Sequence, residues 1–230
     1  MSRTGLAGRR VLVVGGGSGI GAAIAHAFRA EDSAVVTADL RGADLSVDVT
    51  DESSVAAMAE AAGQVDVLVN SAGILTQSPL TQMSLTQWQE TIDVDLTGVF
   101  LVCRHVVPGM VDKGWGRVIN VASQLALKGG VGLTHYSAAK AGVLGLTKAL
   151  ALEVAPAGVL VNAIAPGPIE TPLVRGITED WKAAKRAELP LRRFGIPDEV
   201  APTAVLLASD PGGNLYVGQT LGPNSGDVMP

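Results

Sequence analysis

A tyrosine and a lysine four residues apart, Tyr136 and Lys140, could together perform proton transfer. Side chains at positions i and i+4 lie on one face of a helix, so the two groups would project side by side. A free tyrosine has a pKa near ~10, and a neighbouring ammonium group favours the phenolate and lowers that pKa. An isolated pair of this kind is more often a solvated surface feature, so the assignment depends on the surrounding sequence.

A serine precedes this pair at a position suited to ligand binding. Ser123 ends the apolar run RVINVAS, and the carboxyl end of a strand in an open α/β sheet is where ligands bind. Its hydroxyl could hold a substrate oxygen while Tyr136 exchanges a proton with that oxygen. Gln124 and His135 flank these positions and are candidate substrate contacts.

A glycine-rich turn follows the first apolar run, VLVV, and precedes a helix-like segment. The turn reads GGGSGIG over residues 15–21. Glycine permits a tight turn and close approach of the backbone, and a helix N-terminus offers amide donors to a pyrophosphate. The strand–turn–helix context predicts a dinucleotide-binding turn. Its expected cofactor contacts are Gly15, Ser18, Gly19, Ile20 and Gly21.

An aspartate, Asp39, ends the second apolar run, AVVTAD. A carboxylate there can accept hydrogen bonds from both ribose hydroxyls and would repel a 2′-phosphate. Arg41 is the nearby cation that could hold a phosphate, because the glycine turn carries no basic side chain. We therefore expect NAD as the cofactor, in preference to NADP.

The elements that position these residues alternate along the chain. Continuous apolar strands separated by helices indicate a parallel sheet covered on both faces, so we predict one Rossmann-type, doubly wound α/β domain over residues 1–230. Only LRGAD separates Asp39 from the next short strand, 45–49, so we expect the crossover helix there to be missing. The other expected strands are 11–14, 34–39, 65–70, 117–123 and 159–166, with helices at 19–30, 86–110 and 135–155.

The composition fits a compact enzyme-like chain, with 47% apolar and 17% charged residues. A net charge of −5 argues against nucleic acid as the main partner. The single cysteine, Cys103, excludes a disulfide framework and is expected to be a buried packing residue; three scattered histidines predict no metal site. Lys148 and Glu153 interrupt the apolar segment weighed as a membrane span, so we expect a soluble, cytoplasmic protein without a membrane partner.

Together these features resemble the short-chain dehydrogenase/reductase family, and the resemblance covers nearly the whole chain. NSAG at 70–73 is similar to the family's N-N-A-G strand end, and DVT at 48–50 to its adenine-contacting segment. PGPIET at 166–171 resembles the family's P-G-x-x-x-T. Further on, PLRRFGIPDEVAPTAVLLASD followed by GQTL is typical of the C-terminal part of such enzymes.

The resemblance implies hydride transfer between NAD(H) and a secondary alcohol or ketone. It implies Tyr136 as the general acid/base and Ser123 as the partner of the substrate oxygen. Lys140 would tune Tyr136 and bind the nicotinamide ribose, while Ile169 and Thr171 would hold the carboxamide. The remaining implied cofactor contacts are Asp48, Val49, Asn70, Ala72, Gly73, Pro166 and Gly167.

Three positions depart from the family pattern. Asp95 in VDLTGVF stands where the family has asparagine, which supports a water linked to the lysine. An aspartate adds a negative charge that would strengthen the lysine's charged form, so Asp95 is retained as the fourth catalytic position. Val14 replaces a common threonine, and the C-terminal GPNSGDVMP replaces V-D-G-G with no role that can be read from its residues.

Two other functions stay open beside an alcohol dehydrogenase or ketone reductase. A reductase of 3-oxoacyl thioesters, carried on acyl-carrier protein or CoA, would favour a basic surface near the mouth and usually NADPH. Asp39 and the acidic net charge argue mildly against it. A nucleotide-sensing protein without turnover would not need Ser123, Tyr136 and Lys140 together.

The segment after Thr171 is expected to form a lid, residues 172–195, over the pocket and to set specificity. LVRGI and Trp181 predict a largely apolar wall, with Arg175 as a candidate anchor for an anionic group. The apolar faces of the helices at 94–110 and 135–155 exceed what one sheet face needs. In relatives such helices pair between subunits, which implies a homotetramer.

Overall fold

The computed structural model, which describes residues 4–174 and 178–229, is built around a seven-stranded sheet. All its strand pairs are parallel, in the order β3-β2-β1-β4-β5-β6-β7. This confirms the predicted Rossmann-type, doubly wound α/β fold. The strands are β1 (Arg10–Val14), β2 (Ala34–Asp39), β3 (Leu45–Ser46), β4 (Val67–Asn70), β5 (Gly116–Val121), β6 (Val159–Ile164) and β7 (Thr220–Leu221).

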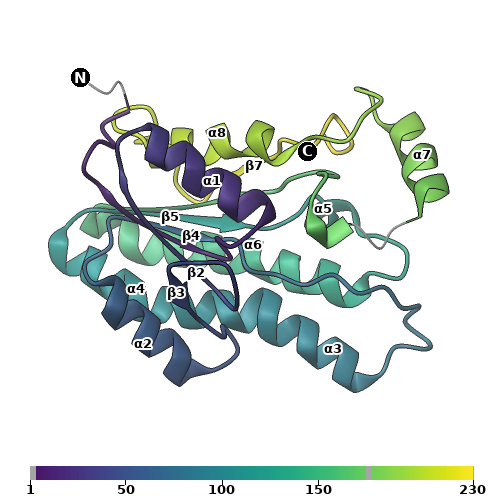
Figure 1. Cartoon of the computed structure of the whole chain (residues 1–230), viewed down its shortest axis with the longest axis horizontal. Helices are drawn as coiled ribbons and strands as arrows, with labels where there is room; N and C mark the ends of the chain where they lie inside the picture. Colours follow the sequence, from purple (N-terminus) through teal and green to yellow (C-terminus); the bar gives the residue numbers. More distant parts are fainter. Residues whose placement is uncertain (1–3, 175–177, 230) are drawn as a thin grey trace.

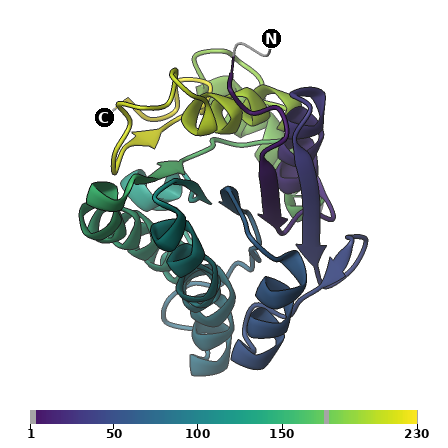
Figure 2. The ribbon, with the colours of Figure 1, turned by 90° about the vertical axis from the view of Figure 1, so that its left-hand side faces the viewer.

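Helices cover both faces of the sheet (Figures 1 and 2), which is why its central strands are continuously apolar. One core lies between the sheet and the pair α1–α8, with Phe28 fully buried in it. The second core lies between the sheet and α2, α4 and α6, with Met110 fully buried in it. The bounds are α1 (Gly19–Ala30), α2 (Glu52–Ala62), α3 (Leu85–Ile92), α4 (Gly98–Lys113), α5 (Leu125–Lys128), α6 (Thr134–Val154), α7 (Glu179–Glu188) and α8 (Pro197–Ala208).

The order of the strands reverses direction between β1 and β4. The chain runs outward from β1 through β2 to β3, and then returns to place β4 on the other side of β1. Loops that leave the carboxyl ends of β1 and β4 therefore diverge and open a crevice between them. This topology fixes the place of the site before any side chain is considered.

The connection from β2 to β3 contains no helix, as the short LRGAD segment predicts. The Asp44 carboxylate closes the turn by accepting hydrogen bonds from the Thr37 amide (2.9 Å) and the Thr37 hydroxyl (2.8 Å). Strand β3 spans two residues, shorter than the expected 45–49, because Asp48 forms its own turn by accepting from the Thr50 amide at 2.9 Å. The edge strand is thus confirmed, and its length is corrected.

The most apolar long helix among the described residues is not α6, which contains Lys148 and Glu153. It is the continuous run Leu85–Lys113, made of α3, a π-helical turn (Asp93–Thr97) and α4. By length and composition alone this run could span a membrane. Half of its most apolar window is buried inside the fold, however, and α4 packs against α2, β4, β5 and α6, as a core helix does.

Candidate active site

One cleft of about 1190 Å³ opens beside the carboxyl ends of the central strands. The turn after β1 borders it, as do the segments after β4, β5 and β6, the short helix α5 and one face of α7. Its volume exceeds the range of about 300–1,000 Å³ that is typical of small-molecule sites, which suits a dinucleotide together with a small substrate.

Ser123, Tyr136 and Lys140 line this cleft together. Ser123 follows β5, and its Oγ accepts from the Leu125 amide at 3.1 Å, at the start of α5. Tyr136 and Lys140 lie one turn apart on α6, with Lys140 Nζ 5.7 Å from the centre of the Tyr136 ring. All three residues are buried, so a charge on one strongly affects the others.

The pKa of Tyr136 is raised above its ordinary value. Burial raises it most, Lys140 lowers it, Asp95 raises it, and the Ser123 hydroxyl lowers it. The sequence predicts that Lys140, with a cationic nicotinamide ring, lowers this pKa. Lys140 acts in the predicted direction, but among the protein's own groups burial outweighs it.

Asp95 is a fully buried carboxyl on the π-helical turn. Its Oδ1 accepts from the Ile74 amide at 2.9 Å and lies 3.9 Å from Lys140 Nζ. Burial raises the pKa of Asp95, and the charge of Lys140 opposes that rise. A Cβ on Gly73 would lie 2.7 Å from Oδ1, so glycine is required for this approach. Asp95 is not among the described residues that line the cleft, so any effect on a ligand passes through the neighbours it acts on, Lys140 and Tyr136.

The glycine turn has the shape of a phosphate cradle. Gly15 has φ +79°, and a Cβ there would lie 2.2 Å from the Ala72 amide nitrogen. A Cβ on Gly21 would lie 2.1 Å from the carbonyl oxygen of Gly15. Ser18, the N-cap of α1, has an extended backbone, and its side chain makes no capping bond within the described chain. The first-turn amides of α1 therefore remain as donors, and a pyrophosphate fits this donor set.

Asp39 lies against the same turn. Its Oδ2 accepts from the Gly17 amide at 3.0 Å, and its Oδ1 accepts from the Leu40 amide at 2.7 Å. The carboxylate therefore borders the cleft at the end of β2, where a ribose would meet it. Arg41 is exposed next to it.

The predicted nicotinamide contacts also line the cleft. The loop that carries Ile169 is held by two backbone bonds: the Glu170 amide donates to Gly195 at 2.9 Å, and the Gly195 amide donates to Pro168 at 3.0 Å. Thr171 lies beside the glycine turn, because a Cβ on Gly19 would come within 3.5 Å of its methyl group. The other predicted contacts along the cleft are Ile20, Asp48, Val49, Ala72, Gly73, Pro166 and Gly167, together with Gln124.

Two predicted contacts do not line the described cleft. The Asn70 side chain donates to Asn120 Oδ1 at 2.9 Å, in a buried chain that continues from Asn120 Nδ2 to the Thr147 hydroxyl. His135 is fully buried, with Nε2 2.8 Å from the Thr76 hydroxyl. One residue along a helix is a rotation of ~100°, which turns His135 away from the face that carries Tyr136. Burial lowers the pKa of His135 and favours its neutral form.

The structure also adds residues that the motifs missed. Leu75 and Thr76 continue from the NSAG strand end into the cleft, so extending that motif would have found them. Asp227, in the uninterpreted C-terminal segment, borders the cleft without any sequence signal.

Arg175, the predicted anchor for an anionic group, lies outside the described residues. Cys103 is buried, and burial raises the pKa of its thiol to about 12, which confirms it as a packing residue.

A family model described as "Enoyl-(Acyl carrier protein) reductase" matches residues 15–226. The chain belongs to the short-chain dehydrogenase/reductase family. It is therefore an oxidoreductase of a family that uses NAD(P), and the glycine cradle lies within the matched residues.

Two curated relatives of this short-chain dehydrogenase/reductase match over nearly their whole length. The 3-oxoacyl-(acyl-carrier-protein) reductase FabG of Vibrio harveyi is 38% identical over 97% of this chain and 99% of its own. The cis-4-hydroxycyclohexanecarboxylate dehydrogenase of Sinomonas cyclohexanicum is 40% identical over 95% of this chain and 96% of its own.

A solved structure superposes closely on the chain. A provisionally assigned NAD(P)-dependent gluconate 5-dehydrogenase from Beutenbergia cavernae, solved with NADP at low occupancy, aligns with a TM-score of 0.91 and 35% identity. The alignment covers 96% of this chain and 97% of that one.

Proposed function

We propose that this protein transfers a hydride between NAD(H) and a secondary alcohol or its ketone. The observation that carries the proposal is the placement of Ser123, Tyr136 and Lys140 along one cleft with the glycine cradle and Asp39. The name of the Sinomonas relative, a dehydrogenase of a ring-borne secondary alcohol, supports this substrate class.

Each residue has a distinct part in the proposed chemistry. A bound nicotinamide cofactor supplies the hydride acceptor or donor. In the oxidation direction the phenolate of Tyr136 accepts the hydroxyl proton, and in reduction the phenol returns it. Ser123 holds the substrate oxygen by a hydrogen bond, and the Lys140 ammonium stabilises the phenolate. Asp95 positions Lys140 from behind through the contact at 3.9 Å.

The cofactor preference is proposed to be NAD. The carboxylate of Asp39 supports it, because this oxygen pair stands at the end of β2 and would repel a 2′-phosphate. The exposed Arg41 next to it is the side chain that would have to compensate for that repulsion if NADP were used.

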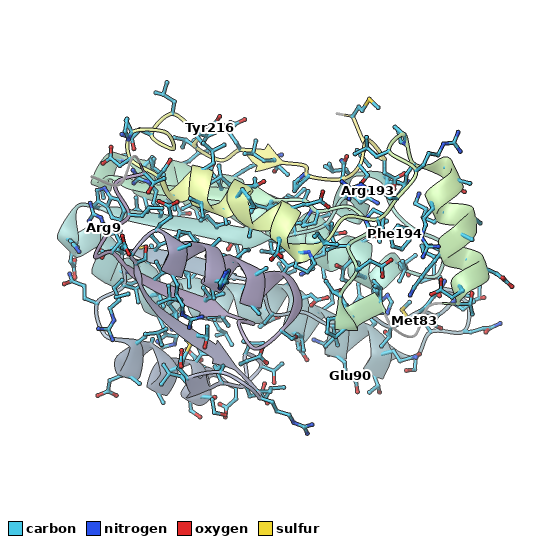
Figure 3. The ribbon with its side chains drawn as sticks, turned by 45° about the horizontal axis from the view of Figure 1, so that its top comes forward. Arg9, Met83, Glu90, Arg193, Phe194 and Tyr216 are labelled. Atoms are coloured by element: carbon cyan, nitrogen blue, oxygen red, sulfur yellow. The ribbon has the colours of Figure 1, made fainter. Side chains whose placement is uncertain are left out.

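Residues 172–195 are proposed to act as a lid over the substrate end of the cleft. Helix α7 within this segment begins at a Thr178 cap, whose hydroxyl accepts from the Trp181 amide at 3.4 Å. Arg186, near the end of α7, has its guanidinium carbon 5.3 Å from the centroid of the Phe194 ring. Phe194 lies beside α7 (Figure 3). Trp181 and Phe194 line the cleft and make this wall largely apolar.

Reduction of a 3-oxoacyl thioester is the second candidate, supported about as well by the relatives. The names of the matching family and of the Vibrio relative point to acyl-carrier substrates. In this chain Val131 lines the cleft and is 94% exposed, and Trp181 is 47% exposed, so the mouth is apolar and open enough for an acyl chain.

A cytoplasmic homotetramer is the proposed form. Its support in this chain is a set of exposed apolar side chains on α4 and α6, Phe100, Val111 and Leu152, which a second subunit would cover. Light scattering of the purified protein tests the assembly, and a monomer at micromolar concentration would contradict it.

The function is tested by following reduced nicotinamide spectrophotometrically with NAD and NADP in turn. The substrates are secondary alcohols, diols, hydroxy acids, their ketones and an acetoacetyl thioester. Tyr136→Phe should lose on the order of a hundredfold or more in kcat, because it removes the proton-transferring hydroxyl. Tyr216→Phe is the matched control, since the other tyrosine lies outside the cleft, away from α7 (Figure 3).

The outcomes separate the candidates. Turnover with NAD that is lost in Tyr136→Phe and kept in Tyr216→Phe supports the alcohol–ketone proposal. A strong preference for NADP would reject the role given to Asp39. Faster turnover of the thioester than of every ketone would select the second candidate, and equal activity of the two tyrosine variants would reject the acid/base assignment.

A further inference from the structure

The C-terminal segment places a carboxylate in the substrate end of the cleft. Asp227 Oδ1 accepts hydrogen bonds from Lys128 Nζ at 2.8 Å and from Lys185 Nζ at 2.9 Å. Its Oδ2 accepts from Gln124 Nε2 at 2.5 Å. These partners come from α5, from α7 and from the position next to Ser123, and Figure 1 shows the yellow C-terminal segment on the same side of the molecule as α5 and α7.

The backbone around Asp227 holds this carboxylate in place. The Asn224 side chain accepts from the Gly226 amide at 3.0 Å and donates to the Val228 carbonyl at 2.8 Å. The Asp227 amide donates to the Asn224 carbonyl at 3.1 Å. The segment is therefore a tight turn fixed from within, and its carboxylate is presented to the two lysines at a defined position.

The charges on this wall balance. Lys185 also donates to Glu188 Oε2 at 3.1 Å, so Lys128 and Lys185 face two carboxylates, one on the tail and one on α7. Lys140 is the only other cation among the described residues that line the cleft, and it belongs to the Tyr136 pair. The apolar side chains described above make up most of the remaining wall. A substrate carboxylate would thus meet no unpaired lysine there.

Both members of the central ion pair favour their charged forms. Burial works against ionisation of Asp227, but the hydrogen bonds from Lys128 and Lys185 keep its pKa below the ordinary value. Burial likewise disfavours the charged form of Lys185, while the bonds to Asp227 and Glu188 keep its pKa above the ordinary value. The pairing persists at neutral pH, because neither group is near its titration.

A free carboxylate competes poorly with Asp227. The tail carboxylate is part of the same chain, and a tethered group has an effective concentration in the millimolar range or above. The matching family region ends at residue 226, one position before this side chain.

We propose that Asp227 is a specificity-determining residue: by neutralising Lys128 and Lys185 it makes the substrate end of the cleft select uncharged substrates over carboxylates. This inference rests on the proposed oxidoreductase function and narrows its substrate class to uncharged, largely apolar alcohols and ketones.

The test compares two ketones that differ in one charge, 4-oxocyclohexanecarboxylate and its methyl ester. The wild type should favour the ester in kcat/KM by about tenfold or more, since a carboxylate meets only paired cations. Asp227→Asn leaves Lys128 without a carboxylate partner and Lys185 paired with Glu188 alone, and it should shift this ratio toward the carboxylate by about tenfold or more. A wild type that prefers the carboxylate, or an unchanged ratio in Asp227→Asn, would overturn the proposal.

Two further variants keep the test informative if Asp227→Asn folds poorly. Lys185→Gln removes one cation and leaves two carboxylates, Asp227 and Glu188, beside the single cation Lys128, so it should increase the preference for the ester; a decrease would contradict the proposal. Glu179→Gln is the matched control on α7, because Glu179 pairs with Lys182 and Arg186 and is not among the described cleft residues. A control that shifts the ratio as much as Asp227→Asn would reduce the effect to helix stability and overturn the inference.

A binding measurement separates this inference from the reaction itself. Calorimetry with cyclohexanecarboxylate should show binding at least about tenfold tighter to Asp227→Asn than to the wild type, whether or not any ketone is turned over. Tighter binding without turnover would support the charge selection and reject the proposed reaction. Turnover of the ester without any gain in carboxylate binding would do the reverse.

Discussion

Replacing Gly21 with alanine should weaken cofactor binding. Among the glycines of the turn whose φ is not positive, we expect this alanine substitution to have the largest effect. A Cβ at this position would lie 2.1 Å from the Gly15 carbonyl oxygen, whereas real Cβ contacts essentially never fall below 3.0 Å. The first turn of α1 and the glycine loop must therefore move apart by roughly 1 Å. A displacement of that size in a binding site costs on the order of a hundredfold in kcat/KM.

The effect on stability should be smaller than the effect on binding. Overpacking costs about 1–3 kcal/mol, while alanine gains about 1 kcal/mol over glycine inside a helix, so the free energy of unfolding should fall by about 0–2 kcal/mol. Gly109→Ala is the matched control. It lies in α4, and a Cβ there would meet none of the described atoms within 4 Å. It should keep wild-type cofactor binding and gain about 0.5–1 kcal/mol.

The assay titrates NADH by its fluorescence and measures urea unfolding for both variants. A Gly21→Ala protein that is folded in urea titrations and binds NADH at least about tenfold more weakly fits the steric argument, since tenfold is ~1.4 kcal/mol. If Gly21→Ala binds NADH as tightly as Gly109→Ala does, the glycine turn is not the cofactor cradle. That result would refute the reasoning from close approach.

Two other perturbations follow from buried polar contacts. Thr147→Val removes the acceptor for Asn120 Nδ2 in the buried chain and should cost about 1–3 kcal/mol of unfolding free energy by urea denaturation; a loss below ~0.5 kcal/mol would mean that Asn120 finds another acceptor. Asp95→Asn removes the carboxylate that raises the pKa of Tyr136, so this pKa should fall and the pH profile of alcohol oxidation should extend to lower pH. An unmoved profile, measured as kcat over a pH series, would leave Asp95 with a purely structural role.

The parts of the fold that were predicted depend on local pattern. Strands β1, β2 and β6 begin and end within two residues of their predicted bounds. They could be predicted because the strands of a parallel sheet covered on both faces are continuous apolar runs in the sequence. Helices α1 and α6 follow from their length, and the glycine turn from its place between a strand and a helix. Ser123 and Tyr136 line the same cleft, as predicted, because both lie near the carboxyl ends of the strands.

The parts that were missed depend on contacts between distant segments. Strand β7 has two residues and no pattern of its own; it exists because β6 offers an open edge. Helix α8 contains Pro202 in its interior, which reads as a helix breaker in the sequence. Asp227 contacts Gln124, 103 positions away, and Lys128, 99 positions away, so no local spacing in the sequence could predict these contacts.

His135 shows the limit of reading a site from neighbours in the sequence. It stands next to Tyr136, yet adjacent positions on a helix point in directions ~100° apart, and its ring is fully buried. The direction in which the pKa of Tyr136 shifts could not be predicted from the sequence either, because the balance between desolvation and the lysine charge depends on packing. Residue type and spacing predicted the participants, and packing set their protonation.

The π-helical turn at Asp93–Thr97 constrains how this segment can change in length. A π turn amounts to one residue more than an α-helical path needs, and one residue rotates everything beyond it by ~100° about the helix axis. Deleting a residue there would restore a regular helix but would turn either Asp95 away from Lys140 or the buried face of α4 toward solvent. The extra residue thus corrects the rotation between the two parts of one continuous helix. It allows Asp95 to face Lys140 while the apolar side chains of α4 still face the hydrophobic core.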